Sequence, residues 1–162
     1  DNPFQNAVYS YGHRNPQGLA WDKDGNLWAT EHGRSGSLSG FDELNLIEKG
    51  KNYGWPLIQG DETREGMVSP VIHSGADKTW APAGAAFLNG KIYFGGLRGE
   101  ALFEYDLVQK SMKEYFKGQF GRIRAVAVKN GFLYITTSNT DGRGNLRAGD
   151  DKMIKINPES LK

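Results

Sequence analysis

Cysteine is absent from this 162-residue chain, so no disulfide holds the fold and no thiolate carries chemistry. An excess of one charge is also missing, since 20 Lys and Arg residues balance 19 Asp and Glu residues. This balance argues against a general nucleic-acid binder, because such affinity scales with the number of neutralised phosphates. No apolar run approaches the roughly 18 residues that a membrane span needs. The first ten residues lack a signal-peptide core, so we expect a cytosolic protein or a chain that begins after processing.

Several enzyme motifs are missing as well. The three histidines, His13, His32 and His73, are scattered and lack zinc-ligand spacing. The chain contains no nucleophile elbow, and the glycine-rich string "GRSGSLSG" lacks the strand-to-helix context of phosphate-binding loops. A convincing helix is also missing, because the one candidate, Asp42–Gly50, is too short and too β-branched. These absences leave an all-β protein without a common hydrolase, metalloprotease or nucleotide-binding signature.

Glycine and aromatic residues are abundant, with 22 Gly, 8 Phe, 7 Tyr and 4 Trp. This composition favours many short strands joined by tight turns. Three segments share one pattern: an apolar strand, a turn with Asp-Gly or Asn-Gly, and a second apolar strand. The segments are Gly18–Glu31, Gly84–Gly96 and Ala125–Ser138.

The spacing of these hairpins predicts a β-propeller. The turn glycines Gly25, Gly90 and Gly131 are separated by 90 − 25 = 65 and 131 − 90 = 41 residues. The second spacing fits a blade of about 40–45 residues, and the first fits a blade with a loop insertion around residues 31–79. Further strands are expected at Ala101–Leu107 and Asp151–Asn157.

The sequence therefore predicts one partial propeller domain over residues 1–162, with about three four-stranded antiparallel blades. A closed propeller typically has four to eight blades, so we expect an incomplete ring whose edges need a partner.

Four arginines stand at comparable points of the repeat. Arg14 precedes the first hairpin, Arg98 follows the second, and Arg122 and Arg124 precede the third. Because residues two apart in a strand face the same side, Arg122 and Arg124 are expected to point together. Four guanidiniums on one rim would suit a multiply charged anion, since each planar fork pairs with a carboxylate. The alternative is a set of solvated surface arginines.

Two further features left alternatives open. The loop Thr30–Asn45 combines several glycines with the acidic pair Asp42 and Glu43, which suits either a calcium site or a flexible solvated loop. Trp80 precedes the second hairpin and is either a sugar-stacking platform or, more often for such a residue, a structural aromatic.

Five strings carry a resemblance to a known family: "YGHRNPQGLAW", "EHG", "DELNLIEKGKNYGWP", "LRG" and "GRIRAV". Together they resemble the soluble quinoprotein glucose and aldose sugar dehydrogenases, which use pyrroloquinoline quinone (PQQ) and calcium. The resemblance runs from about Tyr9 to Lys155. Members of that family are six-bladed propellers of roughly twice this length, so the chain is similar to their C-terminal half.

The resemblance implies a set of site residues. Cofactor contacts would come from Arg14, Asn15, Arg98, Arg122 and Arg124. The backbone carbonyls of Gly33 and Arg34 would hold the catalytic calcium, although the family usually has proline in place of Arg34. A second calcium would lie near Glu43 and Tyr53, and Trp80 would line the substrate cleft.

The implied activity is the oxidation of aldoses at C1 with PQQ and calcium, with electrons passing to an acceptor. The family's general-base histidine lies upstream of this chain, so no catalytic residue carries over and the fragment alone is expected to be inactive. The implied partners are a sugar, the missing N-terminal half and the electron acceptor, in a secreted or periplasmic setting. The alternative function is a non-catalytic propeller that binds a protein or a carbohydrate at its rim.

Overall fold

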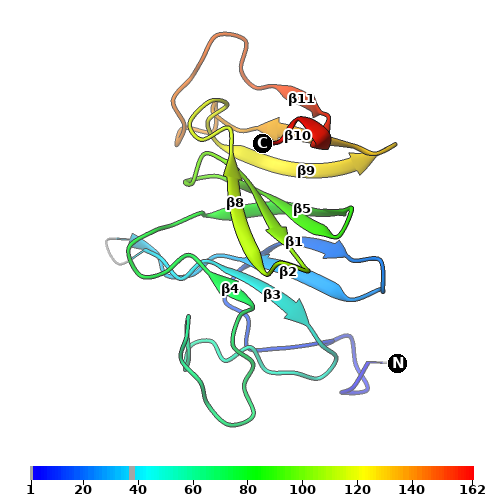
Figure 1. Ribbon diagram of the computed structural model, residues 1–162. Helices are drawn as coiled ribbons and strands as arrows, with labels where there is room; N and C mark the ends of the chain where they lie inside the picture. Colours follow the sequence, from blue (N-terminus) through cyan, green and yellow to red (C-terminus); the bar gives the residue numbers. More distant parts are fainter. Residues whose placement is uncertain (1, 37–38) are drawn as a thin grey trace.

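The computed structural model describes residues 2–36 and 39–162, and its strands form three antiparallel sheets (Figure 1). The first sheet has the order β1-β2-β3-β4: β1 (Pro16–Trp21), β2 (Leu27–Glu31), β3 (Glu43–Ile47) and β4 (Ile72–His73). The second has the order β5-β6-β7-β8: β5 (Pro82–Leu88), β6 (Lys91–Gly96), β7 (Leu102–Asp106) and β8 (Ser111–Tyr115). The third has the order β9-β10-β11: β9 (Ile123–Lys129), β10 (Phe132–Thr137) and β11 (Met153–Ile156).

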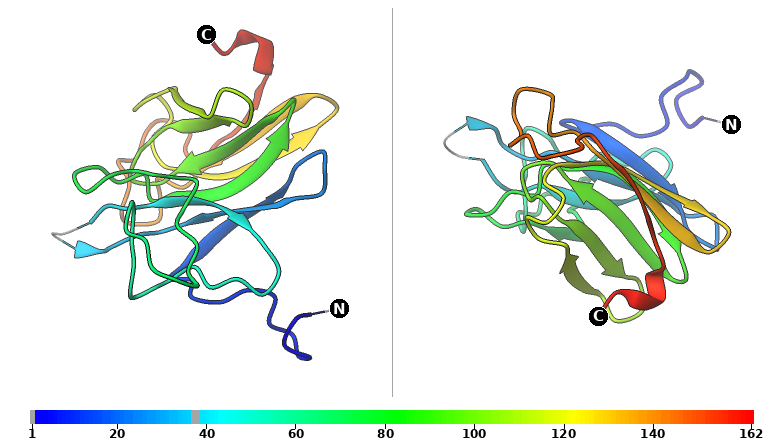
Figure 2. Two further views of the ribbon diagram at one scale, coloured as in Figure 1. Left: turned by 60° about the horizontal axis from the view of Figure 1, so that its bottom comes forward. Right: turned by 90° about the horizontal axis from the view of Figure 1, so that it is seen from above.

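The three sheets are consecutive blades of a propeller, as the sequence predicted. Their first strands lie next to one another, β1 against β5 and β5 against β9, so the sheets stack in chain order (Figure 1). The N-terminal segment extends from the first sheet, and the short 3₁₀ turn Pro158–Ser160 follows β11 at the other end of the stack (Figure 2). Within the described ranges, no helix has both the length and the apolar character needed to cross a bilayer.

All three predicted hairpins are present as β1–β2, β5–β6 and β9–β10. Their turn glycines have positive φ angles, +82° at Gly25, +79° at Gly90 and +77° at Gly131. Asn89 and Asn130, which precede the last two glycines, also have positive φ angles, +50° and +51°. Two successive positive φ angles are what a two-residue type I′ turn requires, and Asn-Gly meets that requirement with little strain.

Three details differ from the sequence prediction. The stretch around 31–79 is not one loop insertion, because it contributes β3 and β4 to the first blade and leaves loops at 32–42 and 48–71. The segment Asp42–Gly50 contains the unpredicted strand β3, in which Leu44, Asn45 and Ile47 are buried. The third sheet has three strands in the described residues, not four, and the second gains the unpredicted strand β8.

The core lies between the blades. One cluster of buried side chains joins the first two sheets and includes Trp28, Leu44, Phe94 and Phe103. A second cluster joins the second and third sheets around Leu102, Ile123, Leu133 and Ile135. Because successive side chains in a strand face opposite sides, the middle sheet, β5–β8, supplies side chains to both clusters.

Glycine allows the first strands of neighbouring blades to approach closely. A Cβ atom at Gly18 would lie 2.4 Å from the carbonyl oxygen of Ala83, and one at Gly84 would lie 3.1 Å from the Cα of Ala125. The Thr30 hydroxyl fixes the same approach, because it donates to the Ala83 carbonyl at 2.8 Å and accepts from the Gly18 N–H. This tight seam brings the loops at one end of the three blades together.

Candidate functional site

The loops that carry the predicted site meet at one end of the blade stack. In each antiparallel hairpin, the start of the first strand and the end of the second strand lie at the same edge. Residues 32–42 follow β2, residues 97–101 follow β6 and residues 138–152 follow β10. Equivalent loops from three blades therefore surround one region.

A cavity of about 380 Å³ opens between these loops, and we call it the arginine cavity. Four guanidinium-bearing residues line it: Arg34, Arg98, Arg122 and Arg143. They come from the three loops and from the segment before β9. Two of the predicted anion-binding arginines, Arg98 and Arg122, thus share one cavity, whereas Arg14 and Arg124 lie beside it.

Arg122 and Arg124 converge as the strand geometry predicted. Nη2 of Arg122 donates to Oδ2 of Asp141 at 2.9 Å, and Nη2 of Arg124 donates to the same oxygen at 3.1 Å. The backbone N–H of Arg143 donates to the other Asp141 oxygen at 3.0 Å. The Arg143 N–H and the Arg122 side chain together lower the pKa of Asp141 to about 2. One carboxylate therefore organises three arginine residues around the cavity.

The other two predicted arginines, Arg14 and Arg98, donate hydrogen bonds to residues that follow β2. Nη1 of Arg14 donates to the carbonyl of His32 at 3.2 Å, and Nη2 donates to the hydroxyl of Ser35 at 2.7 Å. Nη1 of Arg98 donates to the hydroxyl of Ser39 at 3.0 Å. Residues His32, Ser35 and Ser39 after β2 therefore contact Arg14 on the first blade and Arg98 on the second.

Asn15 and Trp80 are placed differently from the arginines. The Asn15 side-chain oxygen accepts from Gln17 at 2.8 Å, and Asn15 is not among the residues that line the arginine cavity. Trp80 is only 8% exposed, and its ring packs against Phe94 and Phe103 with centroids 5.7 and 5.6 Å away. The ring of Trp80 is therefore part of the core between the first two blades, while its neighbours on either side line the cavity.

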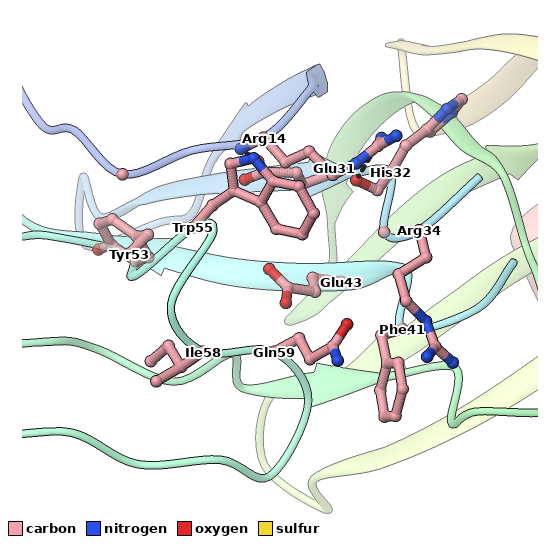
Figure 3. A pocket seen from close by; sticks show the side chains of 12 residues that line it. Arg14, Glu31, His32, Arg34, Phe41, Glu43, Tyr53, Trp55, Ile58 and Gln59 are labelled. Atoms are coloured by element: carbon pink, nitrogen blue, oxygen red, sulfur yellow. Dashed lines mark hydrogen bonds between the residues drawn. The ribbon is translucent and has the colours of Figure 1, made fainter. Parts of the chain in front are cut away.

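A second, much smaller cavity lies beside the first, and we call it the acidic cavity (Figure 3). Its volume is about 10 Å³, near the space that one water molecule or one ion occupies. Glu31 and Glu43, paired across β2 and β3, both line it. Figure 3 shows the Glu43 carboxylate pointing into the space between Trp55 and Gln59.

The two glutamates have different surroundings. Glu31 is buried and accepts from the backbone N–H groups of Arg14 and Asn15, while its second oxygen contacts Nδ1 of His13 at 3.1 Å. Glu43 accepts only from the Asn45 amide, at 3.1 Å, among the side chains of the described residues. Burial raises the pKa of Glu43, and the charge of Glu31 raises it further. A cation in this cavity would favour the ionised form of Glu43.

The predicted calcium ligands fit this cavity in part. Tyr53 lines it, but its hydroxyl donates to the Leu46 carbonyl at 2.6 Å and accepts from the Glu48 N–H at 2.8 Å. The Tyr53 hydroxyl is therefore already engaged in two hydrogen bonds. No group of three or more His, Cys, Asp or Glu side chains in the described part of the chain is arranged to hold a metal. A calcium ion here would need carbonyl oxygens and water besides the two carboxylates.

Asp42, the other half of the predicted acidic pair, is a buried structural anchor. Its Oδ1 accepts from the Gly33 N–H at 2.9 Å. Its Oδ2 accepts from the Thr79 hydroxyl and from the backbone N–H groups of Trp80 and Ala81, at 2.6–2.8 Å. A side chain at Gly33 would clash, because its Cβ would lie 2.1 Å from the Gly40 carbonyl oxygen. Asp42 therefore fixes the position of the Gly33 backbone between the two cavities.

All three histidines have partners. His13 stacks on Tyr53 with ring centroids 4.6 Å apart, in addition to its contact with Glu31. Nε2 of His32 lies 2.8 Å from the Pro82 carbonyl and must donate its proton there, because a carbonyl oxygen only accepts. His73 contacts Asp61 and accepts from the Gly75 N–H.

Sequence reasoning missed two residues of this region. Arg143 lies in a loop that the sequence prediction left undescribed, although "DGRG" repeats the glycine-flanked arginine of "GRSG" and "LRG". Glu31 was not singled out either, and only the strand register shows that it faces Glu43. The first could have been found from the repeat; the second depends on sheet pairing.

Fold and site together define a β-propeller segment with an arginine-lined cavity where the loops of its blades meet. The chain belongs to the Glucose / Sorbosone dehydrogenase family, which matches residues 1–147.

Solved structures and curated relatives are consistent with this family. The PQQ-bound aldose sugar dehydrogenase of Streptomyces coelicolor is 41% identical, superposes with a TM-score of 0.87, and is matched over 95% of this chain and 46% of its own. The aldose sugar dehydrogenase YliI of Escherichia coli is 31% identical over 99% of this chain and 48% of its own length. The quinoprotein glucose dehydrogenase B of Acinetobacter calcoaceticus is 42% identical over 49% of this chain and 16% of its own length. The chain thus spans less than half the length of the curated relatives it matches.

Proposed function

We propose that this chain is the C-terminal half of a sugar dehydrogenase that oxidises aldoses at C1 with PQQ and calcium. The observation that carries the proposal is the arginine cavity, where loops of three blades bring guanidiniums to one place. The family membership and the PQQ-bound Streptomyces relative support it.

The residues of the arginine cavity fit a polycarboxylate cofactor. PQQ has three carboxylates, and guanidiniums pair with carboxylates through two parallel hydrogen bonds. Arg98 and Arg122 line the cavity, with Arg124 beside Arg122 and Arg14 at the adjoining wall. The bound quinone would supply the two-electron acceptor chemistry, and the chain's arginines would hold and orient it.

The acidic cavity has room for one ion, and Glu31 and Glu43 supply carboxylates to a wall that Arg14 and Arg34 also line. Glu43 has a raised pKa and few partners, so a cation would relieve an unfavourable buried charge. Gly33, whose N–H is held by Asp42, lines the acidic cavity, and its neighbours His32 and Arg34 line both cavities. We assign the acidic cavity to the calcium predicted at Glu43 and Tyr53, and the Gly33–Arg34 carbonyls to the calcium beside the cofactor.

The general base is proposed to lie in the other half of the protein. His13 and His73 are held by carboxylates, and His32 already donates its Nε2 proton to a carbonyl. The remaining blades, a sugar and an electron acceptor are the proposed partners, in a secreted or periplasmic setting as for the family.

The proposal is tested by a dye-linked dehydrogenase assay on this chain, alone and mixed with the N-terminal half of its full-length protein. PQQ and calcium are supplied in both. We expect activity only in the mixture, because losing a general base typically lowers rates about 10²–10⁴-fold.

Turnover by the chain alone would place the base within it. His32→Asn would then identify His32, the histidine that lines both cavities, as that base. An inactive mixture in which both halves are folded would contradict the proposed function.

A further inference from the structure

Three arginines lie in corresponding loops of the three blades. Each lies in the loop after the second strand of its sheet and next to a glycine: Arg34 after β2, Arg98 after β6 and Arg143 after β10. All three line the arginine cavity. The corresponding loops of the three blades therefore bring them to one cavity.

The charge of these three side chains is uncompensated within residues 2–36 and 39–162. None of the three forms a salt bridge with a carboxylate there. Asp42 lines the same cavity, but four donors already occupy its oxygens. Asp141 is held by Arg122 and Arg124. The cavity thus presents positive charge to any ligand.

Local contacts hold these arginines near the cavity. Arg34 lies in the wall between the two cavities: its guanidinium is 4.6 Å from the centroid of the Phe41 ring, which lines the acidic cavity, and its Nε is buried without a partner among the described residues. Arg143 follows Gly142, which has a φ of +80°, and its N–H is bonded to the carboxylate that also holds Arg122. Arg143 is therefore linked through the Asp141 carboxylate to Arg122 and Arg124, two of the predicted cofactor arginines.

We propose that the side chains of Arg34 and Arg143 join Arg98 in a three-arginine receptor for a multiply charged oxyanion. This extends the receptor beyond the arginines that the family resemblance implied. The ligand's identity rests on the proposed function: the charged group is either a carboxylate of the cofactor or an acidic group on the sugar. Both are oxyanions that a guanidinium fork recognises.

The test measures binding to the full-length protein by titration calorimetry with four probes: PQQ, glucuronate, glucose 6-phosphate and glucose. Citrate is a fifth probe that is independent of the cofactor. The variants are Arg143→Ala, Arg34→Ala and Arg143→Lys, and the matched control is Arg64→Ala on the exposed 48–71 loop. We expect each alanine variant to bind an oxyanion about three- to tenfold more weakly, with partial recovery in the lysine variant.

The probes separate the two sources of the charge. Weaker PQQ binding assigns the receptor to the cofactor. Unchanged PQQ binding with weaker glucuronate or glucose 6-phosphate binding, and unchanged glucose binding, assigns it to an acidic sugar. Unchanged binding of all oxyanions, citrate included, in folded variants overturns the inference. A wild-type protein that binds citrate but not PQQ would instead contradict the proposed function and leave the receptor standing.

Discussion

The acidic cavity and the arginine cavity share His32 and Arg34 in their walls, yet they differ in charge and in construction. Two glutamates and two arginines line the first, whereas four arginines and one aspartate line the second. The carboxylates come from paired strand ends, where register fixes Glu31 opposite Glu43. The guanidiniums come mainly from loops that project beyond the sheets. Strand residues give a small, desolvated space suited to one ion, whereas loop residues give a wide space suited to a large anion.

Replacing Asp42 should have the largest effect, because Asp42 fixes the backbone that separates the two cavities. Asp42→Ala would leave four donors without an acceptor, two of them in buried hydrogen bonds, and would release Gly33 from the segment before β5. We expect unfolding free energy to fall by about 3–5 kcal/mol, because each unsatisfied buried donor costs about 1–3 kcal/mol before relaxation. Urea unfolding measures this, with the exposed Asp24→Ala as control. A loss below about 1 kcal/mol would show that water replaces the anchor.

Glu43→Gln should sharpen the comparison by removing charge from the acidic cavity alone. In chelator, we expect the variant to melt about 2–4 °C higher, the shift that about 1 kcal/mol produces in a domain of this size. The reason is that burial disfavours the charged carboxylate of the wild type. Calcium should raise the melting temperature of the wild type but not of this variant. Glu48→Gln, on the exposed side just after β3, should keep the calcium response.

The pH dependence of that difference has a defined sign. The pKa of Glu43 is raised above its ordinary value of 4.5, so the folded state holds a proton that the unfolded state releases. Wild-type stability without calcium should therefore fall as pH rises above about 4.5. The advantage of Glu43→Gln should vanish below that pH. An advantage that persists unchanged under acid conditions would locate its cause elsewhere.

Asp141→Asn should have the smallest effect and should act on the arginine cavity. The pKa of Asp141 is lowered to about 2 by the Arg143 N–H and by Arg122. The ionised carboxylate therefore stabilises the folded state fully at pH values above 3.8, the ordinary pKa of aspartate. That contribution is lost as pH falls through about 2. Melting curves of wild type and variant should differ at neutral pH and coincide near pH 2. Curves that coincide at every pH would mean that the carboxylate does not organise the arginines.

The hairpins and their turns could be predicted from the sequence because both depend on neighbouring residues. Asn89-Gly90 and Asn130-Gly131 dictate the turn by their tolerance of positive φ, wherever the hairpin packs. The β3 strand was missed because its pairing partner β2 is separated from it by a long glycine-rich loop. The local pattern of "ELNLI" is too short to decide between a turn of helix and a strand.

The sequence by itself determined the repeat, the blade type and the arginines that sit at equivalent points of it, since period and turn chemistry are local properties. Only the tertiary structure decided which charged groups share a space. Sheet register places Glu31 opposite Glu43. The Asp42 carboxylate accepts four hydrogen bonds from two separate segments, and the Trp80 ring packs in the core. The physical reason is that burial and pairing depend on contacts between residues far apart in the chain, which no local pattern contains.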